Sequence, residues 1–281
     1  MHRNVLINEI KEKQSYLCVG LDTDITKIPK HLQQNKNAIV DFNKAIIDAT
    51  KDYCVSYKLN TAFYEVLGSK GWDAMQETVN YIPSTHLKIA DAKRGDIGNT
   101  SSQYAKAFFE TLQFDAITVA PYMGEDSIRP FLEYENKWTI VLGLTSNKGA
   151  GDFEMQRCIS TGNDTGTFLY EKVIETVSKW GTPNNLMFVT GATQTSELET
   201  IRKIIPDNFL LVPGVGFQGG SLTEVSKYGL SKDCGLLVNA SRAIIYAGDG
   251  ENFAEEAATI ASQYQTEMKQ YLMNNLITKK L

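Results

Sequence analysis

Short apolar runs alternate along the whole chain with longer stretches in which apolar residues recur at helical spacing. The short runs predict eight strands: Tyr16–Asp22, Cys54–Asn60, His86–Lys93, Ala116–Tyr122, Trp138–Ser146, Leu186–Ala192, Phe209–Gly216 and Gly235–Ile245. The longer stretches predict eight helices: Asn37–Asp52, Trp72–Tyr81, Asn99–Leu112, Asp126–Tyr134, Thr165–Trp180, Ser196–Ile204, Leu222–Tyr228 and Asn252–Asn274. Strands and helices that alternate in this way are typical of a parallel sheet covered by helices.

Eight β-then-α units in about 250 residues predict an α/β fold of the (βα)8 TIM-barrel type. A doubly wound open sheet would give a similar alternation, but the number of units favours the barrel. No linker, low-complexity tract or shift in composition divides the chain. We therefore expect a single domain over residues 1–281, with an extra N-terminal helix and a long C-terminal helix. The longest irregular segment, Asn147–Asn163, follows the fifth strand, where a barrel would carry an active-site loop.

The chain carries 28 basic and 33 acidic residues, which give a formal net charge of −5. This balance provides no overall basic field for nucleic acid or an anionic membrane surface. The N-terminal segment lacks the long apolar region of a signal peptide, and no later run is long enough to span a bilayer. We therefore expect a cytoplasmic protein without a nucleic-acid or membrane partner.

The cysteine and histidine residues are scattered rather than clustered. Cys18, Cys54, Cys158 and Cys234 show no CxxC spacing, and three of them lie in apolar strand-like runs, so we interpret them as buried thiols. None of the three histidines stands beside a candidate carboxylate ligand at a zinc-type spacing. The sequence thus predicts no metal site and argues against histidine-based catalysis.

The third predicted strand ends in a concentration of charge. Strand side chains alternate between faces, so Asp91 and Lys93 project from the same side, and Asp96 follows in the turn. Two carboxylates and an ammonium in this arrangement suit chemistry in which negative charge on a substrate is moved or quenched by a proton. A surface ion pair worth ~0–1 kcal/mol would give the same local pattern. The residues at the other strand ends are therefore needed to distinguish a catalytic site from such an ion pair.

Polar residues also stand at the ends of other predicted strands. The first strand ends in Asp22, the second presents Lys58 and Asn60 on one face, and the fifth ends in Thr145 and Ser146. Because the carboxyl ends of barrel strands converge, we expect these side chains to share a site with Asp91.

A phosphate site is indicated after the seventh and eighth strands. The glycine-rich segment Pro213-Gly214-Val215-Gly216-Phe217-Gln218-Gly219-Gly220 would let backbone N–H groups approach an anion closely, although such segments also form tight turns. Asn239-Ala240-Ser241-Arg242, in the eighth predicted strand, adds a guanidinium that fits phosphate oxygens. The loops after strands seven and eight are the usual phosphate site of barrels.

Taken together, these motifs resemble the orotidine 5′-phosphate decarboxylase family, and the resemblance covers nearly the whole chain. It rests on Gly20-Leu21-Asp22, Lys58, Asp91-x-Lys93-x-x-Asp96-Ile97-x-x-Thr100, Pro213-Gly214-x-Gly216-x-Gln218-Gly219-Gly220 and Ser241-Arg242. The Lys93-Arg94-Gly95-Asp96 motif and the Thr145-Ser146-Asn147 turn are similar to those of the longer bacterial (type 2) subgroup. Ser241 departs from the many relatives that carry glycine before the phosphate arginine.

The resemblance implies conversion of orotidine 5′-monophosphate to uridine 5′-monophosphate and CO2, the last step of de novo pyrimidine nucleotide synthesis, without metal or cofactor. Lys93 would protonate C6 of the pyrimidine as the carboxylate leaves, and Asp91 would face that carboxylate. Lys58 would hold the charged array and contact the ribose, while Asp22 would bind a ribose hydroxyl.

The resemblance also implies how the remaining residues act. Asp96 and Thr100 would reach into the neighbouring subunit's site, which makes the protein a homodimer. Ser146 would read the pyrimidine edge. The other substrate-binding residues it implies are Pro213, Gln218, Gly219 and Arg242, of which Gln218 and Arg242 would grip the phosphate.

Three other functions fit parts of the pattern. A magnesium-dependent sister enzyme, such as a hexulose-phosphate synthase or a keto-gulonate-phosphate decarboxylase, would differ in metal dependence. A Schiff-base aldolase could use Lys58 or Lys93 as a nucleophile, but flanking carboxylates favour the protonated amine. A barrel that binds a phosphate ligand without turning it over has no need for buried alternating charges, whose desolvation costs several kcal/mol per ion.

Overall fold

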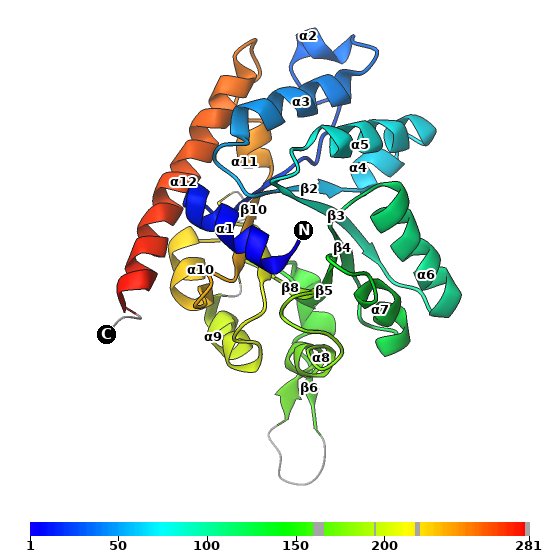
Figure 1. Cartoon of the computed structure of the whole chain (residues 1–281), viewed down its shortest axis with the longest axis vertical. Coiled ribbons are helices and arrows are strands. Elements are labelled where there is room, and N and C mark those ends of the chain that lie inside the picture. Colours follow the sequence, from blue (N-terminus) through cyan, green and yellow to red (C-terminus); the bar gives the residue numbers. More distant parts are fainter. Residues whose placement is uncertain (160–165, 194, 217–219, 279–281) are drawn as a thin grey trace.

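The computed structural model describes residues 1–159, 166–193, 195–216 and 220–278. Eight parallel strands close into a barrel in the order β1-β10-β9-β8-β5-β4-β3-β2 (Figure 1). These strands are β1 (Leu17–Gly20), β2 (Ser56–Asn60), β3 (Leu87–Arg94), β4 (Ala116–Val119), β5 (Trp138–Leu144), β8 (Leu186–Thr190), β9 (Leu210–Pro213) and β10 (Leu236–Ala240). The predicted (βα)8 barrel is therefore confirmed.

Helices surround the barrel and follow its strands (Figure 1). They are α1 (Arg3–Lys13), α2 (Lys30–Gln33), α3 (Ala38–Thr50), α4 (Ala62–Glu65), α5 (Ser69–Tyr81), α6 (Gly98–Lys106), α7 (Glu125–Leu132), α8 (Leu169–Val177), α9 (Thr195–Ile204), α10 (Leu222–Gly229), α11 (Arg242–Ile245) and α12 (Phe253–Thr278). A π-helical turn, η1 (Ala107–Thr111), continues α6. The expected N-terminal and long C-terminal helices are α1 and α12.

Two sequence predictions about local structure are wrong. The eighth strand ends at Ala240 and not at Ile245, so Arg242 begins α11 instead of lying on the strand. The backbone N–H groups of Ile244 and Ile245 donate to the Ser241 carbonyl, which makes this apolar run a helical turn. Periodicity cannot separate a short buried helix from a strand.

The segment predicted to be irregular, Asn147–Asn163, contains regular structure in its described part. It forms a 3₁₀ helix, η2 (Lys148–Asp152), and the strand β6 (Arg157–Cys158), which pairs with β7 (Thr167–Phe168) in an antiparallel hairpin. Residues 160–165 lie outside the described structure. Cys158 on β6 is only partly buried, whereas the other three cysteines are buried as predicted.

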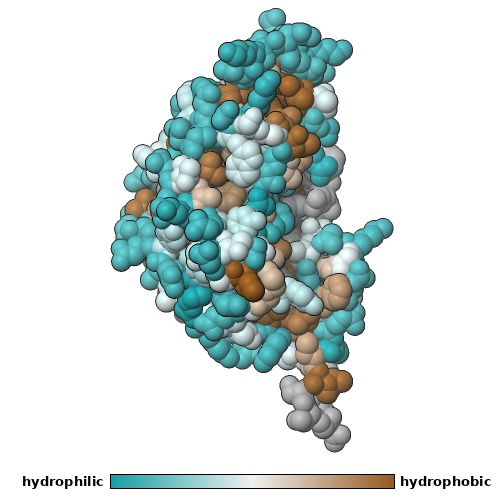
Figure 2. All heavy atoms as spheres, turned by 90° about the vertical axis from the view of Figure 1, so that its right-hand side faces the viewer, coloured by the Kyte–Doolittle hydropathy of each residue, from teal (hydrophilic) through white to brown (hydrophobic). Residues whose placement is uncertain are grey.

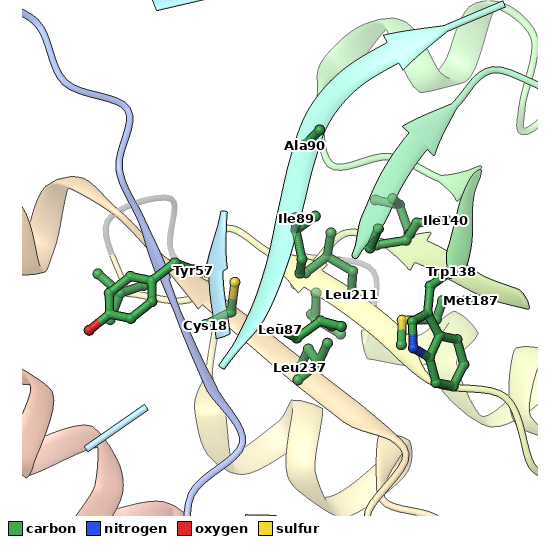
Figure 3. Close-up of a cluster of buried hydrophobic side chains, with 14 of the residues drawn as sticks. Cys18, Tyr57, Leu87, Ile89, Ala90, Trp138, Ile140, Met187, Leu211 and Leu237 are labelled. Carbon is green, nitrogen blue, oxygen red and sulfur yellow. The ribbon is translucent and has the colours of Figure 1, made fainter. Parts of the chain in front are cut away.

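The barrel interior is apolar beneath the strand ends. Leu87, Ile89, Leu211 and Leu237 point toward one another there, and Figure 3 shows Tyr57 lying apart from them. The Tyr57 hydroxyl is instead 2.9 Å from the Thr50 hydroxyl of α3. Because alternate residues face the lumen, Asp91 follows Leu87 and Ile89 on the inner face of β3. The charged residues at the strand ends therefore lie above a layer of buried apolar side chains.

A β-bulge interrupts β3 beside the predicted catalytic residues. Ala90 pairs with Ile117 of β4, but the next pairing joins Arg94 to Val119, so β3 holds extra residues at this point. Lys93 lies within the bulge and has a φ of +48°, in the left-handed region that a lysine rarely adopts. Bulges next to active sites re-aim side chains.

The opposite end of the barrel is closed by α1 and the segment before it. The indole nitrogen of Trp138 donates to the Met1 carbonyl at 2.9 Å, and the Arg3 guanidinium donates to the carbonyls of Pro183 and Asp207. These contacts lie at the amino ends of the strands and leave the carboxyl ends open. Among the helices of the described ranges, none is long and apolar enough to cross a membrane.

Candidate active site

Four charged side chains of alternating sign form a continuous chain across the carboxyl ends of β1, β2 and β3. Asp22 follows β1, and its Oδ1 lies 3.3 Å from the Lys58 Nζ of β2. The same Nζ donates to Asp91 Oδ2 at 3.0 Å. The second oxygen of Asp91 accepts a 2.6 Å hydrogen bond from Lys93 Nζ. The strand ends therefore bring together four of the residues that the sequence predicted to share a site, whereas Thr145 and Ser146 are not among the described residues that line the cavity.

Burial and charge act in opposite directions on this chain. For Lys58, burial favours the neutral amine, but the carboxylates of Asp22 and Asp91 outweigh it and raise the pKa of Lys58 above its ordinary value. For Asp91, burial favours the protonated acid, but Lys58 and Lys93 together hold the pKa of Asp91 well below its usual range. Lys58 is therefore ammonium and Asp91 carboxylate at neutral pH.

The two lysines differ in exposure. The Lys58 side chain is 4% exposed, whereas the Lys93 side chain is 50% exposed. Both line a cavity of about 180 Å³. Its lining comprises Asp22, Lys58, Asn60, Asp91, Lys93, Val189, Leu211, Pro213, Gly214, Val215, Asn239, Ala240, Ser241, Arg242 and Ala243. Lys93 can thus meet a ligand in the cavity and exchange protons with solvent, while Lys58 is locked between carboxylates.

The far side of the cavity carries the predicted phosphate residues. Pro213 ends β9 and Gly214 follows it, and Arg242 begins α11 after β10. Gly214 has a φ of +95°, a backbone conformation open to glycine. The Ser241 hydroxyl donates to the Gly20 carbonyl at 3.0 Å, so this serine joins β1 to the turn before Arg242. Gln218 and Gly219 lie outside the described residues.

A family comparison places the chain among known proteins. Residues 15–257 match the model of the orotidine 5′-phosphate decarboxylase / HUMPS family. The chain belongs to this family. The family resemblance inferred from the sequence motifs is therefore confirmed.

Relatives within the family align over nearly their whole length. A protein of Bacteroides fragilis named orotidine 5′-phosphate decarboxylase is 55% identical over 275 residues, covering 97% of this chain and 98% of that protein. A protein of the same name from Christiangramia forsetii is 59% identical over 266 residues, covering 94% and 96%. The structure of Leishmania donovani OMP decarboxylase superposes with a TM-score of 0.79 at 36% identity and covers 96% and 99%.

Three residues that the family resemblance singled out lie away from the cavity lining. Asp96 follows β3 and accepts the Ile97 N–H, and Thr100 is exposed on α6. Ser146 follows β5 and packs against Gly191, where an added Cβ would come within 2.6 Å of the Ser146 Cβ. None of the three is among the described residues that line the cavity.

Sequence reasoning missed a buried threonine beside the site. Thr118 lies on β4, and its hydroxyl is hydrogen-bonded to both Asp91 and the backbone of Lys93. The available signal was alternation, because Thr118 shares the inward face of its strand with Ala116. Asn60, in contrast, lines the cavity rim and accepts the Ala62 N–H at 3.2 Å.

Proposed function

We propose that this chain decarboxylates orotidine 5′-monophosphate to uridine 5′-monophosphate and CO2, the last step of de novo pyrimidine nucleotide synthesis. Membership of the family supports the reaction. The observation that carries the chemistry is the half-exposed Lys93 ammonium, which lies in the cavity and is held by Asp91 at 2.6 Å.

Lys93 is the proton donor in this proposal. When the bond from C6 to the carboxylate breaks, CO2 leaves and the electron pair stays on C6. Because no adjacent group delocalises that pair well, a fixed ammonium is needed to stabilise it and then to donate a proton. Lys93 supplies both the field and the proton, and its exposure lets solvent restore the proton afterwards.

Asp91 and Lys58 prepare the site for this step. Asp91 is kept ionised by the two lysines and would face the substrate carboxylate, so the repulsion between them is relieved when CO2 departs. The Lys58 ammonium holds the carboxylates of Asp91 and Asp22 in place through its two ion pairs. It would also contact the ribose, while Asp22 would bind a ribose hydroxyl. These contacts order the substrate before the bond breaks.

The phosphate would bind across the cavity from Lys93. Arg242 offers a planar fork for the phosphate oxygens, and Pro213 lines the same cavity. Gln218 and Gly219 complete the set by family resemblance, and Ser146 would read the pyrimidine edge. Because this phosphate is remote from C6, its binding energy can order the site, so the phosphate should raise the rate as well as the affinity.

The reaction is proposed to need no metal. Among the described residues that line the cavity, the acidic groups are the carboxylates of Asp22 and Asp91, and the Lys58 ammonium already lies between them at 3.3 and 3.0 Å. Over the described ranges, no three His, Cys, Asp or Glu side chains are grouped so that they could hold a metal ion. This arrangement supports the decarboxylase over a magnesium-dependent sister enzyme.

A homodimer completes the proposed site. Asp96 and Thr100 lie outside the cavity of their own subunit, so they are free to reach a partner's. Apolar side chains are exposed on the segments that follow β2, β3 and β4, namely Val66, Ile97, Tyr122 and Met123. Tyr122 is 92% exposed. Brown patches interrupt the mostly teal surface on the face shown in Figure 2. An interface at this rim would cover such side chains.

Mixed dimers test the shared site. Asp96→Ala and Lys93→Ala should each be inactive alone, but mixing the two should restore up to about a quarter of wild-type activity, since one site in a mixed dimer then has both residues. Absence of any recovery, with mixed dimers shown to form, would reject the contribution of Asp96 to the partner's site.

We also propose a cytoplasmic location. All four cysteines are free thiols, as expected in a reducing compartment. Thiol titration of protein denatured directly from cells should find four free cysteines, and fewer would contradict this location.

The decisive assay follows the ultraviolet absorbance of orotidine 5′-monophosphate in excess EDTA. Wild-type protein should consume the orotate band and Lys93→Ala should not, while both remain folded. Lys179→Ala, which removes an exposed lysine of a surface ion pair with Glu175, is the matched control and should behave as wild type. No change with wild-type protein would reject the substrate and direct the search to magnesium and pentulose or hexulose phosphates.

A further inference from the structure

The hydroxyl of Thr118 connects the two residues that the proposed reaction depends on. Thr118 lies on β4 and is fully buried. Its Oγ1 accepts a hydrogen bond from the backbone N–H of Lys93 at 2.9 Å and donates one to Asp91 Oδ1 at 3.0 Å. Asp91 Oδ1 also accepts from Lys93 Nζ at 2.6 Å. The three residues thus form a closed ring of hydrogen bonds that holds Lys93 at both its backbone and its ammonium.

The bulge in β3 explains why a hydroxyl is needed at this point. Between Ala90 and Arg94 the backbone of β3 leaves its register with β4. The ladder resumes where the Ala120 N–H donates to the Arg94 carbonyl at 2.8 Å. The Lys93 N–H falls between these pairings and meets the Thr118 side chain instead of a β4 carbonyl. Without that hydroxyl the N–H would lose its protein partner.

The backbone of Lys93 needs external support. A left-handed conformation at a non-glycine residue costs of order 1–3 kcal/mol and persists only where its surroundings impose it. At Lys93 the φ is +48°, and the N–H bond to Thr118 is the hydrogen bond that holds this conformation from the neighbouring strand. Relaxation of the bulge would move the ammonium relative to Asp91.

We propose that Thr118 is a positioning residue, whose hydroxyl fixes the relative placement of Asp91 and Lys93 for proton transfer. This inference rests on the proposed role of Lys93 as proton donor. Thr118 itself does not line the cavity among the described residues, so it acts through the two side chains that do.

The side chain at this position must accept and donate a hydrogen bond at once. Valine has the shape of threonine but does neither, so Thr118→Val opens the ring without creating a large cavity. Serine keeps the hydroxyl and lacks the methyl group that restricts its rotamer. The pair of variants therefore separates the hydrogen bonds from the packing.

Thr139 on β5 provides a matched control. It is also fully buried, and within the described part of the chain its hydroxyl has no hydrogen-bond partner. Thr139→Val makes the same chemical change one strand away, and we expect it to leave turnover unchanged.

The experiment measures kcat and KM for orotidine 5′-monophosphate. Thr118→Val should lower kcat about 10–100-fold, because misplacement of a reacting group by about 1 Å costs this much, while KM changes by less than about threefold. Thr118→Ser should recover most of the loss.

Each outcome bears on the proposal. A wild-type kcat in folded Thr118→Val would overturn it. Equal losses of kcat in Thr118→Ser and Thr118→Val would do the same, because packing and not the hydroxyl would then matter. If wild-type protein is inactive, or if Lys93→Ala is as active as wild type, the proposed function itself fails, and those two measurements identify that failure separately.

Discussion

Lys58 and Arg202 both keep a positive charge inside the protein, but they do so with different partners. The Lys58 ammonium lies between the carboxylates of Asp22 and Asp91 at the open end of the barrel. The Arg202 guanidinium, on α9, donates to four backbone carbonyls and to no carboxylate among the described residues. These carbonyls belong to Gly229, Ile205, Asn208 and Gly235. The Lys58 charge is part of the array of charged side chains at the site, whereas the Arg202 guanidinium makes hydrogen bonds that join neighbouring loops.

The pKa values of the two groups move in opposite directions. The carboxylates overcome burial and raise the pKa of Lys58, while burial lowers the pKa of Arg202 to about 10. Both stay charged at neutral pH. The Lys58 ammonium contributes to the electrostatic field in the cavity, where a substrate would bind. The carbonyl dipoles around Arg202, in contrast, only satisfy the hydrogen-bond donors of its guanidinium. We infer that Lys58 serves function and Arg202 serves stability.

Replacement of Lys58 should give the largest effect on activity. Lys58→Met leaves the carboxylates of Asp22 and Asp91 without the ammonium between them, so the array around Lys93 loses its order. We expect kcat/KM to fall about 100–1,000-fold, the range found when a preorganised electrostatic group is removed. Steady-state kinetics of the folded variant check this. If the variant is less stable but has normal kinetics, Lys58 serves stability as Arg202 does, and the functional difference between the two residues is rejected.

Replacement of Arg202 should change stability and not chemistry. Arg202→Met removes the guanidinium donor from the carbonyls of Gly229, Ile205 and Asn208, whereas the Gly235 carbonyl keeps the Leu210 N–H. Loss of such buried partners costs about 3–5 kcal/mol of unfolding free energy. Urea denaturation measures this, and kcat should match wild type at temperatures where the variant is folded.

Lys203 is the matched control for Arg202. It is the next residue on α9, and its exposed side chain pairs with Glu199 at 3.0 Å. Lys203→Met should leave the unfolding free energy nearly unchanged, because exposed ion pairs contribute little. Equal destabilisation by the two substitutions would show that the carbonyl contacts of Arg202 are not what matters.

A third buried group, His86, extends the comparison to the pH dependence of the unfolding free energy. Burial and the nearby Lys13 ammonium, 2.8 Å away, lower the pKa of His86 to about 4 from its ordinary 6.5. The unfolded chain therefore takes up this proton before the folded chain does. The stabilisation is fully present above pH 6.5 and is lost as the pH falls toward 4, a change of about 2–3 kcal/mol.

Denaturant unfolding at pH 7 and pH 4.5 tests this dependence. His86→Gln should flatten the difference in unfolding free energy between the two pH values, whereas replacement of the exposed His31 by glutamine should not. An unchanged pH dependence in His86→Gln would assign the acid sensitivity to other groups.

The sequence predicted the parts of the site that depend on strand ends. Asp22, Lys58, Asp91 and Lys93 could be grouped because parallel barrel strands all end at one rim, whatever their exact register. The bulge at Lys93, its left-handed backbone and the Thr118 hydrogen bonds depend on the register between β3 and β4, which alternation alone does not encode.

The parts that the sequence missed have the same origin. The hairpin of β6 and β7 pairs residues nine and eleven positions apart across a segment without a strand-like pattern. The partners of Arg202 are backbone carbonyls, which carry no residue-type signal. Contacts made by the backbone or across a bulge thus become visible only in three dimensions.

The central claim is that the Lys93 ammonium gives its proton to C6. The most direct test is the turnover of Lys93→Ala with and without added ethylammonium, which can enter the space left by the lost side chain. We predict a fall in kcat of at least about 100-fold, the contribution of a positioned general acid, with partial recovery that rises with the amine concentration. Wild-type turnover by Lys93→Ala in the absence of amine would contradict the account.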